Sequence, residues 1–397
     1  MPSPFDFLLY EILISRSTRR RCPRALSTLP PGDLSRPVCG LDSDVPANAN
    51  FPVTPFTRNG RTRPLLRFVL TALLVYVMVA ARHVHATVAG TNGQITFTQG
   101  PTNSNGPPLP ANIFVANPDG SHAEEVLLPA GIQVEVFSDS VWSPDGTKLL
   151  ISHTFQLDNN GQCCLFQPAT VNPDGSNFDQ FASSQPATGN CEVWSLDQTR
   201  LLCSFPDGIF SVSVSDGGDP VRLTTYPFGP NCNACDFVQD ISPDGSRFVF
   251  LRFKRENFVG GEHTQQVAIF VENTDGTGLR QITPYGVAEP HEEGSAKFSP
   301  DGTLIISTLT NGQLFVVRPR GTDLTTIKLQ VGTQRYFAFE PQWSPDGTRI
   351  IFCMYINGGE GIFTANPDGS DVKQVTFTTD IPTEFFNGPH WGTHPIQ

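Results

Sequence analysis

Histidines are few in this 397-residue chain, and the first candidates for acid–base or metal chemistry stand in two places. His291, Glu292 and Glu293 are consecutive, and His390 and His394 lie near the C-terminus. Imidazole and carboxylate groups transfer protons near neutral pH and also bind divalent cations. If the fold brings the two places together, they could form an acid–base set or a cation site. Otherwise they are solvated loop residues and structural groups.

A second polar set stands just before large apolar residues that recur along the chain. Because each member is one to three residues away from its apolar residue, we expect the set to face a central channel. The residues are candidate binding groups, and the alternative is a hydrated polar lining without a catalytic role. The members are Glu192, Asp240, Lys297, Glu340, Gln342 and His390.

Cys191 and Cys203 flank a predicted hairpin turn and are candidates for a disulfide. If the turn centres between Asp197 and Gln198, antiparallel pairing puts Cys191 opposite about Ser204. A slight register shift or a bulge would then bring the two sulfur atoms into range.

Four other cysteines are further disulfide candidates, because disulfides are the usual state of cysteines in an oxidising compartment. The last cysteine of the region, Cys353, is expected to stay a buried thiol. A Cys-x-x-Cys pair also occurs, but no second pair or histidine stands at zinc-ligand spacing, so we predict no metal site. The four candidates are Cys163, Cys164, Cys232 and Cys235, the last two pairing with each other or with one of the first two.

The elements that must position these residues belong to a repeat of about 50 residues. Its best copy is Trp343-Ser344-Pro345-Asp346-Gly347, and Ser-Pro-Asp-Gly has the residue types of a tight hairpin turn. The apolar residues that open the copies are separated by 52, 47, 57, 45 and 48 residues. They are Trp142, Trp194, Ile241, Phe298, Trp343 and Trp391, and a second turn of the Asn-Pro-Asp-Gly type accompanies each copy.

A period near 50 with strand-type patterning is the signature of propeller blades. We therefore predict an all-β fold, a six-bladed β-propeller over residues 91–397. Gln94 to Thr98 forms a strand without a preceding hairpin, and Pro389 to Gly392 forms an inner strand without its partners. The two fragments complete each other, so strands from both termini share one blade and close the ring.

The repeats resemble the WD-like propeller repeats of the TolB family, whose blades carry W-S-P-D-G-x-x-I/L-x-F followed by a D-G turn. The resemblance covers about residues 91–397 and implies the propeller fold and a place in the cell envelope. TolB has a sizeable α/β domain before its propeller, which residues 1–90 could not form, so its partners are not carried over. Some sugar-lyase propellers use a His and carboxylate cluster, which gives the alternative of a polysaccharide lyase- or hydrolase-like enzyme.

The first ninety residues differ from the repeats. Residues 1–60 have no periodicity and form a disordered leader or an over-extended gene prediction. Residues 61–86 have a basic start, an apolar run from Phe68 to Ala81 and a small-residue end, as in a secretory signal peptide. A retained membrane anchor is the alternative, although the run is shorter than the roughly 20 residues that span a bilayer.

Charge restricts the partners of the propeller. The formal net charge is −12, but residues 91–397 carry fifteen Lys and Arg against thirty-three Asp and Glu. Such an acidic surface repels nucleic-acid phosphates, so we expect no nucleic-acid binding. We expect a monomer in the periplasm or outside the cell, acting as a protein-binding or scaffold module for unidentified envelope proteins. It would touch a membrane only through an uncleaved leader. We expect no cofactor, although a divalent cation such as calcium could bind.

The leader generates the first testable prediction. Signal peptidase should cleave after Ala86, or alternatively after Ala81, because Val84 and Ala86 occupy the positions where the enzyme accepts small residues. N-terminal sequencing of the natively produced protein should therefore begin at Thr87. Retention of residues 1–60 would contradict the prediction.

Overall fold

The computed structural model describes residues 89–101, 110–132, 134–135, 139–154, 166–181, 190–205, 207–215, 217–225, 236–255, 265–289, 295–378 and 385–397. The chain divides into two compact units, Met1–Ala72 and Leu73–Gln397, and all described residues belong to the second. The predicted leader, residues 1–60 and 61–86, lies outside the described residues. Within them, no helix is long and apolar enough to cross a membrane.

The Ser-Pro-Asp-Gly segments form the predicted turns, because the aspartate ties both ends of each turn together. In the best copy, Asp346 accepts hydrogen bonds from the Ser344 hydroxyl at 2.7 Å and from the Thr348 amide at 2.9 Å. Gly347 has a φ of 71°, which glycine adopts without strain. The backbone amide of Ser344 then bonds to the Arg349 carbonyl, so one strand ends and the next begins within six residues.

Hydrogen bonds of this kind also set the pKa of the turn aspartates. Burial raises the pKa of Asp244, but hydrogen bonds from Ser242 and Ser246 outweigh burial and lower that pKa to about 2. The carboxylate is therefore ionised at neutral pH, and one of its oxygens accepts hydrogen bonds within its own hairpin.

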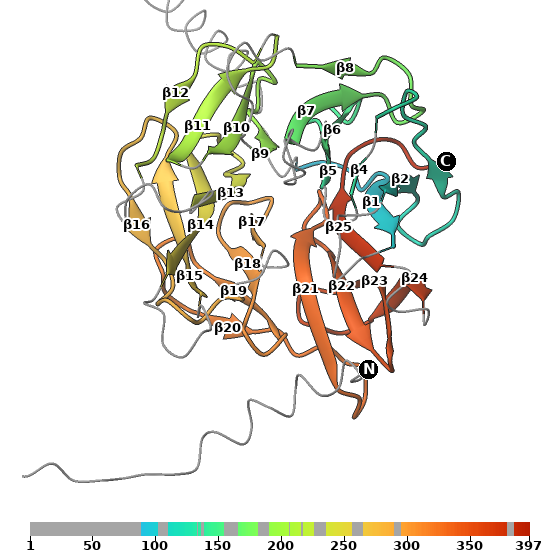
Figure 1. Cartoon of the computed structure of the whole chain (residues 1–397). Coiled ribbons are helices and arrows are strands. Elements are labelled where there is room, and N and C mark those ends of the chain that lie inside the picture. The colour runs from blue at the N-terminus through green and yellow to red at the C-terminus, as the bar shows by residue number, and fades with distance from the viewer. Residues whose placement is uncertain are drawn as a thin grey trace, which may run out of the picture. The chain divides into compact units, whose positions relative to one another are not determined.

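The described strands form six antiparallel sheets, each a blade of a β-propeller, and no helix occurs among the described residues (Figure 1). Blade 1 has β5 (Ser140–Trp142), β6 (Leu149–Thr154), β7 (Phe166–Val171) and β8 (Asp179–Gln180). Blade 2 has β9 (Asn190–Trp194), β10 (Arg200–Phe205), β11 (Gly208–Ser213) and β12 (Val221–Arg222). Blade 3 has β13 (Asp236–Ile241), β14 (Arg247–Arg255), β15 (Gln265–Asn273) and β16 (Arg280–Gln281).

Blades 4 and 5 repeat this order, and blade 6 joins the two ends of the propeller. Blade 4 has β17 (Ala296–Phe298), β18 (Ile305–Thr308), β19 (Leu314–Val317) and β20 (Thr325–Thr326). Blade 5 has β21 (Tyr336–Trp343), β22 (Ile350–Ile356), β23 (Gly359–Ala365) and β24 (Lys373–Thr378). Blade 6 has β25 (Phe385–Trp391), β1 (Ile95–Gly100), β2 (Pro110–Ala116) and β3 (Glu124–Glu125), and β4 (Val134–Glu135) pairs with β2.

Blade 6 confirms that strands from both ends share one sheet. β25 pairs antiparallel with β1, so that Ile95 lies opposite Trp391. The Trp391 indole N–H also donates to the Gly93 carbonyl at 3.0 Å. The segments next to this strand pair contact the turns of the two neighbouring blades. On the blade 5 side, the Gly90 amide bonds to the Pro345 carbonyl. On the blade 1 side, His394 Nδ1 bonds to the Gly146 carbonyl at 2.7 Å.

The core lies between neighbouring blades. Phe248 and Phe250 of blade 3 are fully buried and pack in one cluster with Leu202 and Ile209 of blade 2. The six large residues that open the sequence repeats are at most 6% exposed, as their predicted place between blades requires. Each blade therefore covers one face of the next, and no blade can bury its apolar face alone.

Closure by β25 generates the second prediction. Deleting residues 387–397 removes most of β25 and leaves β1 with an unpaired edge, so we expect the deletion variant to lose cooperative thermal unfolding. Trp391→Ala should be milder, with a loss of about 3–5 kcal/mol in the free energy of unfolding. Scanning calorimetry checks both, and a deletion variant that melts like the full chain would show that the ring does not depend on the shared blade.

Candidate functional site

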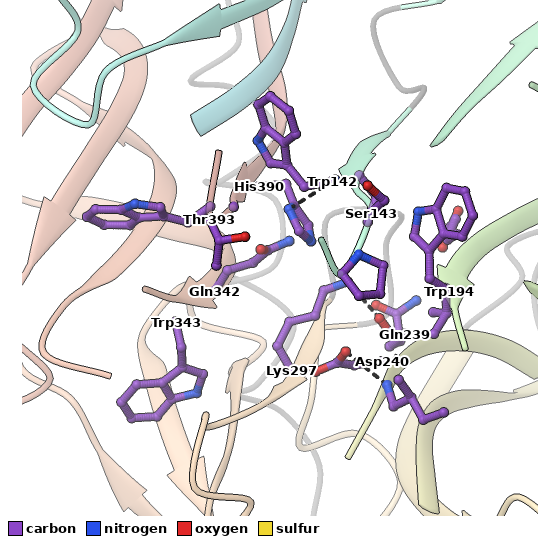
Figure 2. Close-up of a pocket in the computed structure, with 17 residues that line it drawn as sticks. Trp142, Ser143, Trp194, Gln239, Asp240, Lys297, Gln342, Trp343, His390 and Thr393 are labelled. Carbon is purple, nitrogen blue, oxygen red and sulfur yellow. Dashed lines mark hydrogen bonds between the residues drawn. The ribbon is translucent and has the colours of Figure 1, made fainter. Parts of the chain in front are cut away.

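The inner strands of all six blades line a cavity in the central channel, at the end where they enter the Ser-Pro-Asp-Gly turns. The cavity is open to solvent. Figure 2 shows the polar side chains that point toward one another there, with the tryptophans around them. Its polar lining includes Glu192, Gln239, Asp240, Lys297, Gln342 and His390.

Strand alternation explains why these side chains reach the channel. In the inner strands the large apolar residue turns away to pack between blades, so the residue directly before it faces the axis. Asp240 precedes Ile241, Lys297 precedes Phe298, and His390 precedes Trp391. The corresponding residues of blades 1 and 2 are valines, which also line the cavity.

Glu192 reaches the channel through a bulge. The pairing of β9 with β10 shifts register between Leu202 and Cys203, so Glu192 is the extra residue of the inner strand. A bulge re-aims the side chain that it carries. Comparable shifts occur in β13, β21 and β25.

The same bulge confirms the predicted disulfide. It places Cys191 directly opposite Cys203, with the two Cα atoms 4.0 Å apart, and the two residues form a disulfide. In the chain-entropy description a bridge across so short a loop stabilises by about 2–3 kcal/mol. Cys353 is a free, buried thiol, as expected. The remaining disulfide candidates lie outside the described residues; they are Cys163, Cys164, Cys232 and Cys235.

Asp240 and Lys297 bind blades 3 and 4 to each other. The two oxygens of Asp240 accept the amide of Ile241 at 2.9 Å and the amide of Phe298 at 2.8 Å. In the opposite direction, the Lys297 ammonium group donates to the Gln239 carbonyl at 2.6 Å. The two side chains therefore form a reciprocal connection between β13 and β17.

His390 has the corresponding role between blades 6 and 1. Its Nδ1 accepts the backbone amide of Trp142 at 3.4 Å, so the ring must be neutral and carry its proton on Nε2. Burial, followed by the nearby Lys297 charge, lowers the pKa of His390 to about 3. The imidazole is thus a weak base that does not titrate near neutral pH.

The structure places Glu340 away from this cavity, although the sequence suggested a channel position. Glu340 is 8% exposed and lies between β21 and β25, where one carboxylate oxygen accepts the Gly388 amide at 2.7 Å. The Cys353 thiol points to the same oxygen at 3.8 Å. Burial, followed by the charges of Glu340 and Glu360, raises the pKa of Cys353 well above its usual range. This thiol is therefore protonated and unreactive.

Asp139 and Glu360, two carboxylates near this thiol, were missed in the sequence. Asp139 lies three residues before Trp142, as Glu340 lies three before Trp343, so aligning the repeats by their tryptophans would have found it. Glu360 follows a Gly-Gly turn, and nothing in the sequence around it indicates burial. Burial raises the pKa of Asp139, and the Lys297 charge opposes that rise.

The His291, Glu292 and Glu293 cluster lies outside the described residues, so its distance from His390 stays a prediction. His394 is described and stacks on Trp142, with ring centres 5.0 Å apart. Among the described residues no three His, Cys, Asp or Glu side chains stand close enough to hold a metal ion.

Comparison with known proteins identifies the fold but not the function. No protein-family model and no curated protein matches the chain. Among solved structures, TolB from Acinetobacter baumannii is 15% identical with a TM-score of 0.52, over 75% of this chain and 66% of that one. A chain of the Nidogen/Laminin complex is 9% identical with a TM-score of 0.54, over 76% of this chain and all of that one.

The likeness to TolB and to the Nidogen/Laminin chain shows a shared β-propeller fold. This chain spans 66% of TolB, just under two thirds of its length. An oligogalacturonate lyase in complex with manganese is 13% identical with a TM-score of 0.43, which is too low to support any conclusion about activity.

The buried imidazole generates the third prediction. The unfolded chain binds a proton on His390 below about pH 6.5, whereas the folded protein does not until about pH 3. The free energy of unfolding should therefore fall as the pH decreases from 7 to 5, and His390→Asn, which keeps an acceptor for Trp142, should flatten that fall.

A control variant comes from a group that titrates in the opposite sense. Burial raises the pKa of Glu272 to about 7 although Arg252 opposes it, so the folded state holds this proton where the unfolded state has lost it. Glu272→Gln should therefore steepen the fall on acidification. Urea unfolding at several pH values measures both variants, and identical slopes in wild type and His390→Asn would refute the role given to His390.

Proposed function

We propose that the protein is an exported β-propeller that binds other proteins, as a scaffold or docking module in the cell envelope or outside the cell. The observation that carries the proposal is the use of the polar channel residues. Asp240, Lys297 and His390 each bond to the backbone of a neighbouring blade. These groups hold the ring together, which leaves the outer faces of the propeller as the surfaces for a partner.

An acid–base mechanism would need different properties from the same residues. A general base works best when its pKa lies near the working pH and its lone pair faces the substrate. The pKa of His390 is lowered to about 3, chiefly by burial, and its Nδ1 lone pair is occupied by the Trp142 amide. Both oxygens of Asp240 accept backbone amides. Binding therefore accounts for the described channel better than catalysis does.

The disulfide supports the proposed compartment. Cys191 and Cys203 are at most 4% exposed and joined within one blade, as in a structural bridge. Such bridges form and persist in the periplasm and outside the cell. The predicted signal segment, residues 61–86, agrees with export. The fold agrees with protein binding, since one of its solved examples belongs to the Nidogen/Laminin complex.

The fourth prediction tests binding against catalysis. Immobilised wild-type protein should retain a specific protein from an envelope fraction, and the purified partner should bind wild type and His390→Asn equally well. The deletion variant that lacks residues 387–397 is the control, because an opened ring should retain nothing specific. Turnover of acidic oligosaccharides by wild type that is lost in His390→Asn or in His291→Ala would instead establish the lyase- or hydrolase-like alternative.

A further inference from the structure

The second turns of blades 1, 3, 5 and 6 share a side-chain network that the turn of blade 4 lacks. In the turn of blade 5, the Asn366 amide donates to the Ser370 hydroxyl at 2.9 Å, and Asp368 accepts the amide and the hydroxyl of Ser370 at 2.9 and 2.6 Å. The same network holds three further turns, through Asp119, Asp174 and Asp275. These side chains satisfy turn groups that would otherwise bond only to water.

The turn of blade 4 has the same backbone hydrogen bond but not the side-chain network. The Gly321 amide bonds to the Arg318 carbonyl at 2.8 Å, as in the other turns, but Arg318 and Arg320 replace the asparagine and the aspartate. Arg318 pairs with Asp323 at 2.8 Å, and both side chains are more than half exposed. Such an exposed pair contributes little to stability. Within the described residues Arg320 is exposed and makes no hydrogen bond or ion pair.

This turn meets another basic and apolar segment at the outer edge of the propeller. A Cβ atom on Gly321 would lie 2.9 Å from the Ile282 carbonyl, so the turn packs against the residue that follows β16. Leu279 and Arg280 precede that residue and are exposed, and Leu324 follows the turn. Leu279 is 48% exposed and Leu324 is 44% exposed. We call Leu279, Arg280, Arg318, Arg320 and Leu324 the rim patch; β16 and β20, beside it, are the outer strands of neighbouring blades (Figure 1).

The rim patch departs from the turn sequence of the other blades and from the acidic composition of the propeller. Its two packed segments carry three arginines, on a propeller whose residues 91–397 hold more than twice as many acids as bases. The arginines also remove the side-chain hydrogen bonds of the turn and gain one exposed ion pair, between Arg318 and Asp323. A local rule that is broken for so small a gain points to a functional site.

We propose that the rim patch is the docking surface for an acidic segment of a partner protein, one that carries carboxylates and at least one aliphatic side chain. Guanidinium groups bind carboxylates in a planar, two-pronged geometry, and the leucines would cover the aliphatic residue. A polysaccharide with acidic groups would leave both leucines exposed, so it fits the patch less well. This inference rests on the proposed protein-binding function and adds the place and chemistry of the contact.

The fifth prediction uses a variant that restores the repeat. Arg318→Asn together with Arg320→Asp rebuilds the turn network around Thr322, so this variant should melt at the same or a higher temperature than wild type. Its affinity for a fluorescein-labelled peptide of alternating glutamate and leucine should fall by about tenfold or more. Fluorescence anisotropy at low salt measures the affinity, and the same peptide with glutamine in place of glutamate should not bind wild type.

A matched control places the same charges in another blade. Asn366→Arg with Asp368→Arg should lower the melting temperature and leave peptide binding at the wild-type level, because the rim patch is unchanged. Equal peptide binding by wild type and the restored variant would overturn the inference. Competition by heparin or by anionic lipid vesicles at the same strength as by unlabelled peptide would also overturn it. Partner capture by wild type would still stand after such a failure, so the two proposals fail separately.

Discussion

Every blade of this propeller depends on the backbone pairing between β25 and β1. An open ring would leave an unpaired strand edge and expose the apolar face that the next blade covers. The Trp391 indole bond to Gly93 adds a side-chain contact to that pairing. Gly90, before β1, bonds to the turn of blade 5, and His394, after β25, bonds to the turn of blade 1. These two segments therefore take the place of the Ser-Pro-Asp-Gly turn that blade 6 does not have.

The channel follows from the same requirement. Inner strands of neighbouring blades do not pair as a sheet, so their buried polar groups must find partners across the gap. Asp240, Lys297 and His390 supply those partners. A residue that satisfies a buried backbone group is costly to replace even when it never touches a ligand. Polar residues near a propeller axis are therefore weak indicators of catalysis until their hydrogen bonds are known.

Repetition makes departures from the repeat informative. Gln198 takes the place of glycine in the turn of blade 2 with a φ of 58°, and the backbone bond of the turn survives. That exchange is absorbed locally. The two arginines of the blade 4 turn are different, because they remove side-chain bonds and gain only one exposed ion pair. The first departure keeps the backbone bond of the turn, and the second is the basis of the docking surface proposed above.

The sequence by itself determined the blades, their number and their closure, and it named Cys191 and Cys203 as a candidate pair whose bridge depends on a bulge. Those features rest on turns whose residues interact within six positions and on a repeat that can be counted. Only the tertiary structure decided where Glu340 lies, that β4 adds to β2, and that His390 accepts a backbone amide. These three features depend on bulges and on packing between blades that are distant in sequence. The side chains of the neighbouring blade set the burial of a residue and therefore its pKa. The Arg318 and Arg320 turn departs from the Asn-Pro-Asp-Gly pattern in the sequence, but its loss of side-chain bonds became clear only from the hydrogen bonds of the described turns.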